Sequence, residues 1–122
     1  MFNIYFGIPE IRDFWLELEK NINDNTATKD EKRFYKKFVK SLKLLQVNPL
    51  HNGLRTHEIE ILTRKYGRKV WQSYLENNKP SASRIYWVYY PKNSITIIGI
   101  EPHPNDNKHS YETITLSSTV ED

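Results

Sequence analysis

The chain opens with a pattern of hydrophobic positions that predicts one strand followed by one helix. Phe2, Ile4 and Phe6 lie at every second position, which is the period of a strand, and Gly7 ends this pattern. Pro9 then stands where the first residue of a helix is expected. Beyond it, apolar residues recur at the spacing of an amphipathic helix, at positions 11, 14, 15, 18 and 22.

A second, longer helix is predicted after a polar break at residues 21–25. Thr28 and Glu31 have the spacing of a capping box, in which a hydroxyl and a carboxylate satisfy free amides at a helix start. The apolar stripe that follows lies at positions 34, 35, 38, 42 and 45. Asn48 and Pro49 end the helix.

The second half of the chain consists of short β-rich segments separated by turn residues, which predicts an antiparallel meander. The expected strands cover residues 57–62, 70–76, 84–90 and 94–100, with a last short strand at 111–116. We therefore expect an α+β fold, in which the opening strand and two helices pack on one face of an antiparallel β-meander. No repeat or linker divides the chain, so residues 1–122 form one domain, with a loose tail at 116–122.

Composition narrows the class of protein. With 122 residues, of which 38% are hydrophobic, the chain suffices for one core and is too short for two. It has no cysteine, which excludes disulfides and thiolate zinc sites and fits a reducing compartment. No leader pattern or membrane-length apolar run is present, so we expect a cytoplasmic protein with no membrane partner. The net charge of +3 favours an anionic partner only weakly.

Two adjacent segments of the second half carry a resemblance to a known family. Residues 70–74 (VWQSY) and 83–89 (SRIYWVY) resemble the paired strands of toxins of the RelE/ParE superfamily, in which an arginine-aliphatic-aromatic strand follows an aromatic-led one. Residues 95–103 resemble the next strand with its histidine-bearing exit, and residues 3–6 before the proline resemble the opening strand. The likeness extends from residue 2 to residue 116.

This resemblance implies a toxin of a type II toxin–antitoxin system. The expected activity is a ribosome-dependent mRNA endoribonuclease, in which the RNA 2′-hydroxyl attacks the adjacent phosphate with neither a metal nor another cofactor. The implied partners are a cognate antitoxin and mRNA on the ribosome, with rRNA contacts possible. The alternative is a binding protein of the same fold, either catalytically silent or directed at DNA gyrase, as in the ParE branch.

Three residues are candidates for catalysis under this resemblance: Arg84, His103 and Tyr111. A guanidinium at Arg84 can donate two parallel hydrogen bonds to a phosphate, and the alternative is an arginine stacked on aromatic neighbours or paired with a glutamate. An imidazole at His103 can exchange protons near neutral pH, unless it is simply a solvated loop side chain. Tyr111 can stack on a base or assist a proton transfer, or it packs as an ordinary strand residue.

Basic residues outside these positions are candidates for RNA binding. They are Arg64, Lys65, Arg68 and Lys69 in the expected turn, with Lys108 and His109 near the end of the chain. Seven basic residues also follow one another along the second helix, from Lys29 to Lys43, and could meet rRNA phosphates. In both places the alternative is a solvated charged surface.

One feature of the sequence weakens the nuclease hypothesis, and two further candidate sites are less specific. The strand before Arg84 carries Gln72, Ser73 and Tyr74, where the strongest nucleases of the family often have basic residues. Glu58 and Glu60 enter the sheet with His57, and one of these carboxylates could act as a base, although a solvated sheet face is the alternative. No histidine pair has helical metal-ligand spacing, and His103 with Asp106 and His109 offers only a weak loop site, so we expect no metal.

Overall fold

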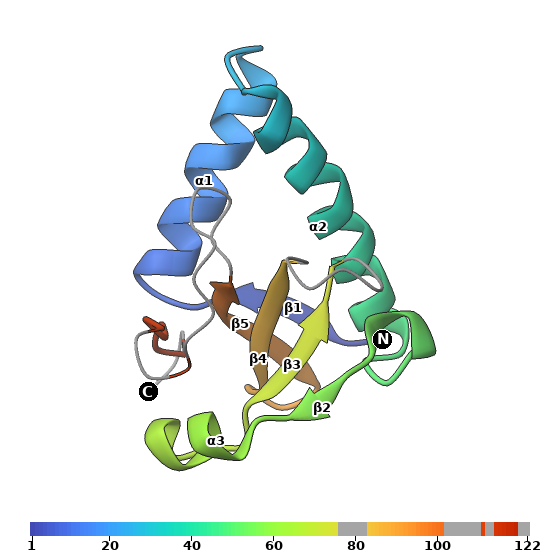
Figure 1. Cartoon of the computed structure of the whole chain (residues 1–122), viewed down its shortest axis with the longest axis vertical. Helices are drawn as coiled ribbons and strands as arrows, with labels where there is room; N and C mark the ends of the chain where they lie inside the picture. Colours follow the sequence, from blue (N-terminus) through green and yellow to red (C-terminus); the bar gives the residue numbers. More distant parts are fainter. Residues whose placement is uncertain (76–82, 102–110, 112–113, 120–122) are drawn as a thin grey trace.

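The computed structural model describes residues 1–75, 83–101, 111 and 114–119, and shows an α+β fold (Figure 1). Its helices are α1 (Glu10–Asn23), α2 (Lys29–Val47), a short 3-10 helix η1 (Asn52–Leu54) and α3 (Glu60–Tyr66). Its strands are β1 (Asn3–Phe6), β2 (His57–Glu58), β3 (Trp71–Tyr74), β4 (Arg84–Tyr89) and β5 (Ser94–Glu101). The α+β class expected from the sequence is confirmed.

The five strands form one mixed sheet in the order β1-β5-β4-β3-β2. The meander from β2 to β5 is antiparallel, as predicted. The opening strand was expected to pack on one face of the meander, and this is wrong. Instead β1 is an edge strand of the sheet and pairs with β5 in parallel, Ile4 opposite Ile95. Parallel neighbours need a crossover connection, and the helical hairpin and the meander between β1 and β5 provide one.

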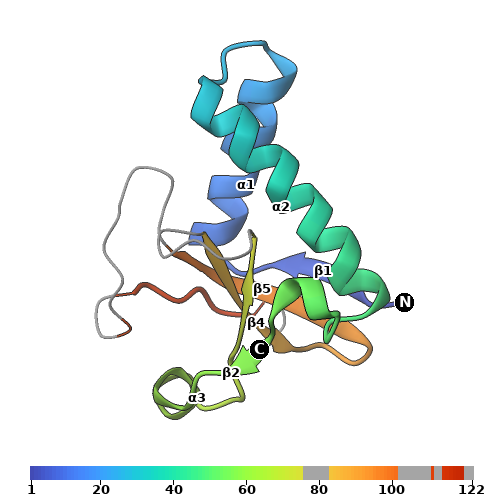
Figure 2. The same ribbon diagram turned by 45° about the vertical axis from the view of Figure 1, so that its right-hand side comes forward.

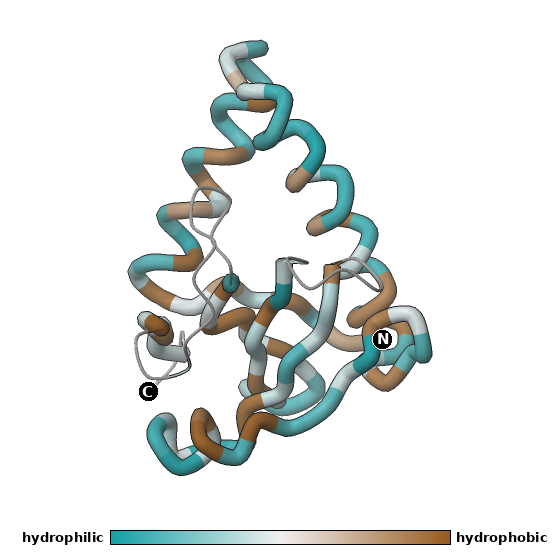
Figure 3. Tube along the Cα trace, viewed as in Figure 1, coloured by the Kyte–Doolittle hydropathy of each residue, from teal (hydrophilic) through white to brown (hydrophobic). Residues whose placement is uncertain are grey.

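The capping box predicted from the sequence is present at the start of α2. The Glu31 amide donates to the Thr28 hydroxyl at 3.0 Å, and the Thr28 amide donates to a Glu31 carboxylate oxygen at 2.9 Å. The hydrogen bond from the Thr28 backbone is the main cause of a lowered pKa for Glu31. Both predicted helices are therefore present, and hydrophobic positions recur along each of them (Figure 3).

The helices α1 and α2 cover one face of the sheet, which we call the first face (Figure 2). Phe38 of α2 and Trp87 of β4 are both fully buried in the shared core. The Trp15 ring of α1 stacks on Phe6 at 5.0 Å and on Tyr35 at 5.7 Å between ring centroids. These aromatic contacts join the hairpin to the β1 side of the sheet.

The opposite face, the second face, has its own cover, which the sequence did not predict. Residues 57–62 were expected to form one strand, but only His57 and Glu58 do so, and α3 begins at Glu60. The reason is that Ile59, Leu62 and Tyr66 also have helical spacing, and all three pack against the second face. Gly67, with φ of 86°, ends α3 in the left-handed region.

The end of the chain also differs from expectation. Tyr111 and residues 114–116 form no strand, so the strand predicted at 111–116 is wrong for its described residues. Ser117 and Thr119, expected in a loose tail, are 1% and 3% exposed. The Ser117 hydroxyl donates to Glu10 at 2.9 Å, and its carbonyl accepts from the Tyr66 hydroxyl at 2.7 Å. Residues 114–119 thus form a bound segment across the second face, which we call the C-terminal segment.

Replacing Gly7 with alanine should destabilise the protein by about 1–3 kcal/mol, because the new methyl group overpacks a closed contact. Its Cβ would lie 2.6 Å from the Ser117 Cβ and 2.9 Å from the Ile97 carbonyl oxygen. Urea denaturation measures the change in unfolding free energy. Gly67→Asn is the control, because asparagine tolerates a positive φ and no atom lies within 4 Å of an added Cβ. Equal stability of Gly7→Ala and the parent would contradict the close contact.

Candidate functional site

The sheet register places polar side chains in two neighbouring rows on the second face. In the first row His57 is opposite Gln72, and Gln72 is opposite Tyr86. The second row joins Tyr74, Arg84 and Glu101 across β3, β4 and β5. The six residues of these two rows, with Arg55 and Tyr111, which contact the rows, form what we call the polar cluster.

A β-bulge in β5 brings Glu101 onto the second face. Trp87 pairs with Ile97, but Tyr86 pairs with Gly99, so Ile98 is an extra residue in this strand. The extra residue reverses the alternation of the strand beyond it. Glu101, which is 6% exposed, therefore lies opposite Arg84.

Two guanidinium groups and an imidazole surround the ring of Tyr74. The Arg84 and Arg55 Cζ atoms lie 5.5 and 5.8 Å from the ring centroid, and the His57 ring lies at 6.5 Å. Arg55 has a φ of 50°, in the left-handed region, where it ends η1. Arg55 and His57 are exposed, and Arg84 and Tyr74 are half-buried. The arrangement offers fixed positive charge and a π-face at the protein surface, which is the chemistry that a phosphate and a base require.

A chain of hydrogen bonds fixes the orientation of the His57 ring. The Tyr111 hydroxyl donates to Gln72 Oε1 at 3.0 Å, so the Gln72 amide group is the donor toward His57 Nε2, 3.5 Å away. At the other side of the ring, His57 Nδ1 lies 3.2 Å from the Arg55 carbonyl oxygen, which can only accept. The network thus assigns the proton of a neutral His57 to Nδ1 and leaves Nε2 as the acceptor.

Tyr86 and Glu101 form the buried floor of the polar cluster. Burial is the main cause of a raised pKa for Tyr86, and Tyr111 and Glu101 add to the effect. The nearby Arg84 guanidinium partly offsets this by lowering the pKa of Tyr86. Within the described residues, no group makes a hydrogen bond of normal geometry with the Tyr86 hydroxyl. Tyr86 therefore stays neutral and provides an unused donor next to Arg84.

The structure brings together two of the three predicted catalytic residues. Arg84 and Tyr111 belong to the same cluster, with the Tyr111 ring edge-on to Tyr86 at 6.1 Å between centroids. The start of β4 lies beside the end of β5, since Arg84 is opposite Glu101. His103 follows Glu101 by two residues, but it lies outside the described residues, as do Lys108 and His109.

The other predicted RNA-binding residues lie away from the polar cluster. Arg64 and Lys65 are exposed in the last turn of α3. Arg68 stacks over Tyr90, which follows the last residue of β4, whereas Arg84 is the first residue of that strand. Lys69 Nζ lies 6.0 Å from the centroid of the Trp71 ring. These cations therefore lie apart from the polar cluster, with Arg68 over a ring of the second face and Lys69 over a ring of the first face.

Several members of the polar cluster were missed as functional candidates. Arg55, Tyr86 and Glu101 come from three different elements, and only the strand register brings them together. Glu58, considered as a base, instead accepts a hydrogen bond from the Thr63 hydroxyl at 2.8 Å at the start of α3. This contact gives Glu58 a structural role in holding the β2–α3 connection.

No family model, no curated protein and no solved structure matches this chain. Within the described residues, no helix has the length and apolarity needed to cross a bilayer. The same part of the chain holds no group of three or more histidine, cysteine or acidic side chains placed to share a metal ion. The functional argument therefore rests on the geometry of the polar cluster.

Proposed function

We propose that this chain is the toxin of a type II toxin–antitoxin system and acts in the cytoplasm as a ribosome-dependent mRNA endoribonuclease of the RelE/ParE type. The observation that carries the proposal is the polar cluster. It combines Arg84, Tyr111 and an oriented imidazole, His57, at one end of the sheet. The element order of one strand, two helices and an antiparallel series of strands supports the same proposal.

In the proposed reaction, the RNA 2′-hydroxyl attacks the adjacent phosphorus, and the bond from phosphorus to the 5′-oxygen breaks. The products are a 2′,3′-cyclic phosphate and a free 5′-hydroxyl. The contact of 3.5 Å from the Gln72 amide to His57 Nε2 opens as the 2′-hydroxyl binds, and Nε2 then accepts the proton of this hydroxyl. The leaving oxygen takes a proton from Tyr111 or from solvent. Arg84 donates hydrogen bonds to the phosphate oxygens, on which charge grows in the transition state.

The proposed partners follow from charge. Exposed cations lie along α2, at Lys29, Lys32, Arg33, Lys36, Lys40 and Lys43. Such a surface suits rRNA phosphates or an acidic antitoxin segment, since each phosphate contact releases a counterion. Both partners are part of the proposal.

A second function fits two features of the same cluster. Gln72 and Ser73 of β3 are uncharged and buried, and Glu101 lies opposite Arg84. A carboxylate there reduces the positive potential available to a phosphate. These features favour the alternative of a binding protein of the same fold, catalytically silent or directed at gyrase.

Expression of the chain alone should slow bacterial growth, and co-expression of the adjacent gene should relieve the arrest. Induced expression with growth curves tests this, and mapping of mRNA 5′ ends separates the two functions. Cleavage within codons indicates the nuclease, whereas arrest with intact mRNA indicates the binding protein. Normal growth with soluble, folded protein would count against both.

A further inference from the structure

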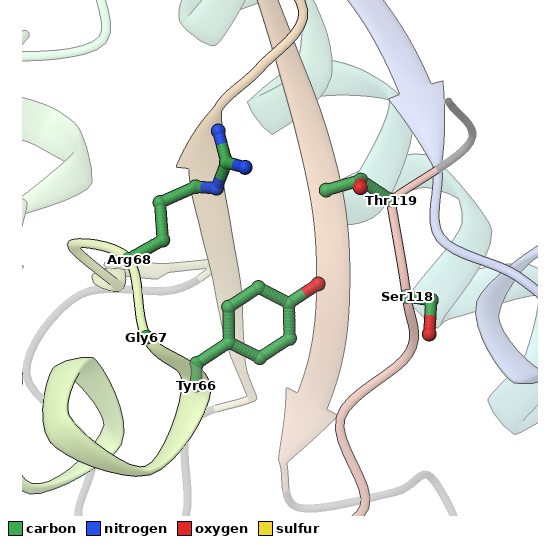
Figure 4. A pocket seen from close by; sticks show the side chains of 5 residues that line it. All are labelled: Tyr66, Gly67, Arg68, Ser118 and Thr119. Carbon is green, nitrogen blue, oxygen red and sulfur yellow. The ribbon is translucent and has the colours of Figure 1, made fainter. Parts of the chain in front are cut away.

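A pocket of about 300 Å³ lies on the second face, between the end of α3 and the C-terminal segment. Tyr66, Gly67 and Arg68 line one side, and Ser118 and Thr119 line the other (Figure 4). The pocket is at the far end of β4 from the polar cluster, because Arg68 stacks on Tyr90, just beyond the last residue of that strand.

Arg68 is held in a position suited to an anion. Its Cζ lies 4.2 Å from the centroid of the Tyr90 ring, so the guanidinium packs on the face of the ring. This contact uses the flat face of the guanidinium and leaves its N–H edges for a planar or tetrahedral anion. Arg68 is exposed, and no described carboxylate forms an ion pair with it.

The α3 side of the pocket carries positive charge. Residues 61–75 contain Arg64, Lys65, Arg68 and Lys69 and no acidic residue. The partial negative charge at the carbonyl end of α3 disfavours a bound anion. This effect is confined to one turn, and all four cations lie in or next to that turn. Thr119 lies across the pocket from the Arg68 guanidinium, whereas the Ser118 hydroxyl points away from it (Figure 4).

We propose that this pocket binds a backbone phosphate of single-stranded RNA, several nucleotides from the phosphate that meets Arg84. The guanidinium of Arg68 can donate two parallel hydrogen bonds to one phosphate at the entrance of the pocket. The six residues of β4 separate the two positions by about 20 Å, which an extended RNA strand spans with a few nucleotides. The inference rests on the proposed function for the identity of the ligand.

The test is binding in solution without ribosomes. In amide NMR titrations with a uridine tetranucleotide and with inorganic phosphate, the signals of Gly67, Ser118 and Thr119 should shift, and acetate should have little effect. Arg68→Gln should weaken tetranucleotide binding on the order of tenfold and reduce the salt dependence by about one counterion. Arg68→Lys should bind with intermediate affinity, because it keeps the charge and loses the fork.

Arg64→Gln is the matched control, with the same loss of charge outside the pocket lining. Equal weakening by Arg64→Gln and Arg68→Gln would overturn the pocket in favour of a diffuse basic surface. Binding of acetate without the tetranucleotide would assign the pocket to a carboxylate-bearing partner and also overturn it. Because no cleavage is measured, a protein that binds at the pocket but never cleaves mRNA would refute the nuclease proposal alone.

Discussion

Replacing Arg84 with alanine should lower the single-turnover rate of mRNA cleavage on programmed ribosomes by about 10²–10³, the usual effect of losing a donor to a developing charge. Arg84 begins β4 and is half-buried beside Tyr74, so its position is set before substrate arrives. Arg84→Lys should retain part of the activity, because lysine keeps the charge without the bidentate fork. Rates are measured at saturating toxin, with a thermal melt of each variant.

A second variant separates catalysis from folding. Glu101 is buried opposite Arg84, and a buried carboxylate that loses a nearby positive charge is costly. Arg84→Ala alone is therefore expected to lower the melting temperature, and the double variant Arg84→Ala/Glu101→Gln should restore it. If the double variant regains both stability and cleavage, Arg84 has only a structural role. Recovery of stability without cleavage supports the contact with phosphate.

Local signals in the sequence were sufficient to predict the helical hairpin and the long strands. Thr28 and Glu31 form both hydrogen bonds of the capping box within three residues of each other, so their spacing alone predicts the start of α2. The β-rich segments around Trp71 and Trp87 have turn residues at their ends, and their burial on the first face is consistent with their alternation. In these places local preference and tertiary packing agree.

The errors arose where one pattern fits two structures or where a partner is distant in sequence. Residues 57–62 alternate like a strand, yet Ile59, Leu62 and Tyr66 share one helical face, and contact with the second face favours the helix. The polar part of the C-terminal segment, residues 117–119, reads as a loose tail. It is bound through contacts made more than 100 residues away, such as Ser117 with Glu10. No local rule predicts such a pairing.

The candidate site was predicted only in part for the same reason. Arg84 and Tyr111 came from the family resemblance, and the register brings them together. The bulge at Ile98, which turns Glu101 toward Arg84, leaves no mark in the sequence pattern. Gln72, read as a missing basic residue, is 1% exposed and bridges Tyr111 and His57. An ammonium at that depth would lose hydration, so the neutral amide suits the buried position.

Replacing His57 with glutamine should lower the cleavage rate by about 10²–10⁴, which is the usual contribution of general acid–base catalysis. Glutamine can present an oxygen where Nε2 lies and so keep the contact with Gln72, but it cannot take up the proton of the 2′-hydroxyl near neutral pH. Single-turnover cleavage on programmed ribosomes measures this loss, with a thermal melt of the variant beside it.

Three further variants identify the proton acceptor. His51→Gln is the control, because this exposed imidazole accepts from the Gly53 amide at 2.9 Å and lies outside the polar cluster. Gln72→Leu breaks the link from Tyr111 and should lower the rate less than His57→Gln, since it releases the orientation of the ring but keeps the imidazole. Arg55, Arg84 and Tyr74 surround His57 and are unchanged in all of these variants. If His57→Gln cleaves at the parent rate and His103→Gln does not, the proton acceptor is His103 instead of His57.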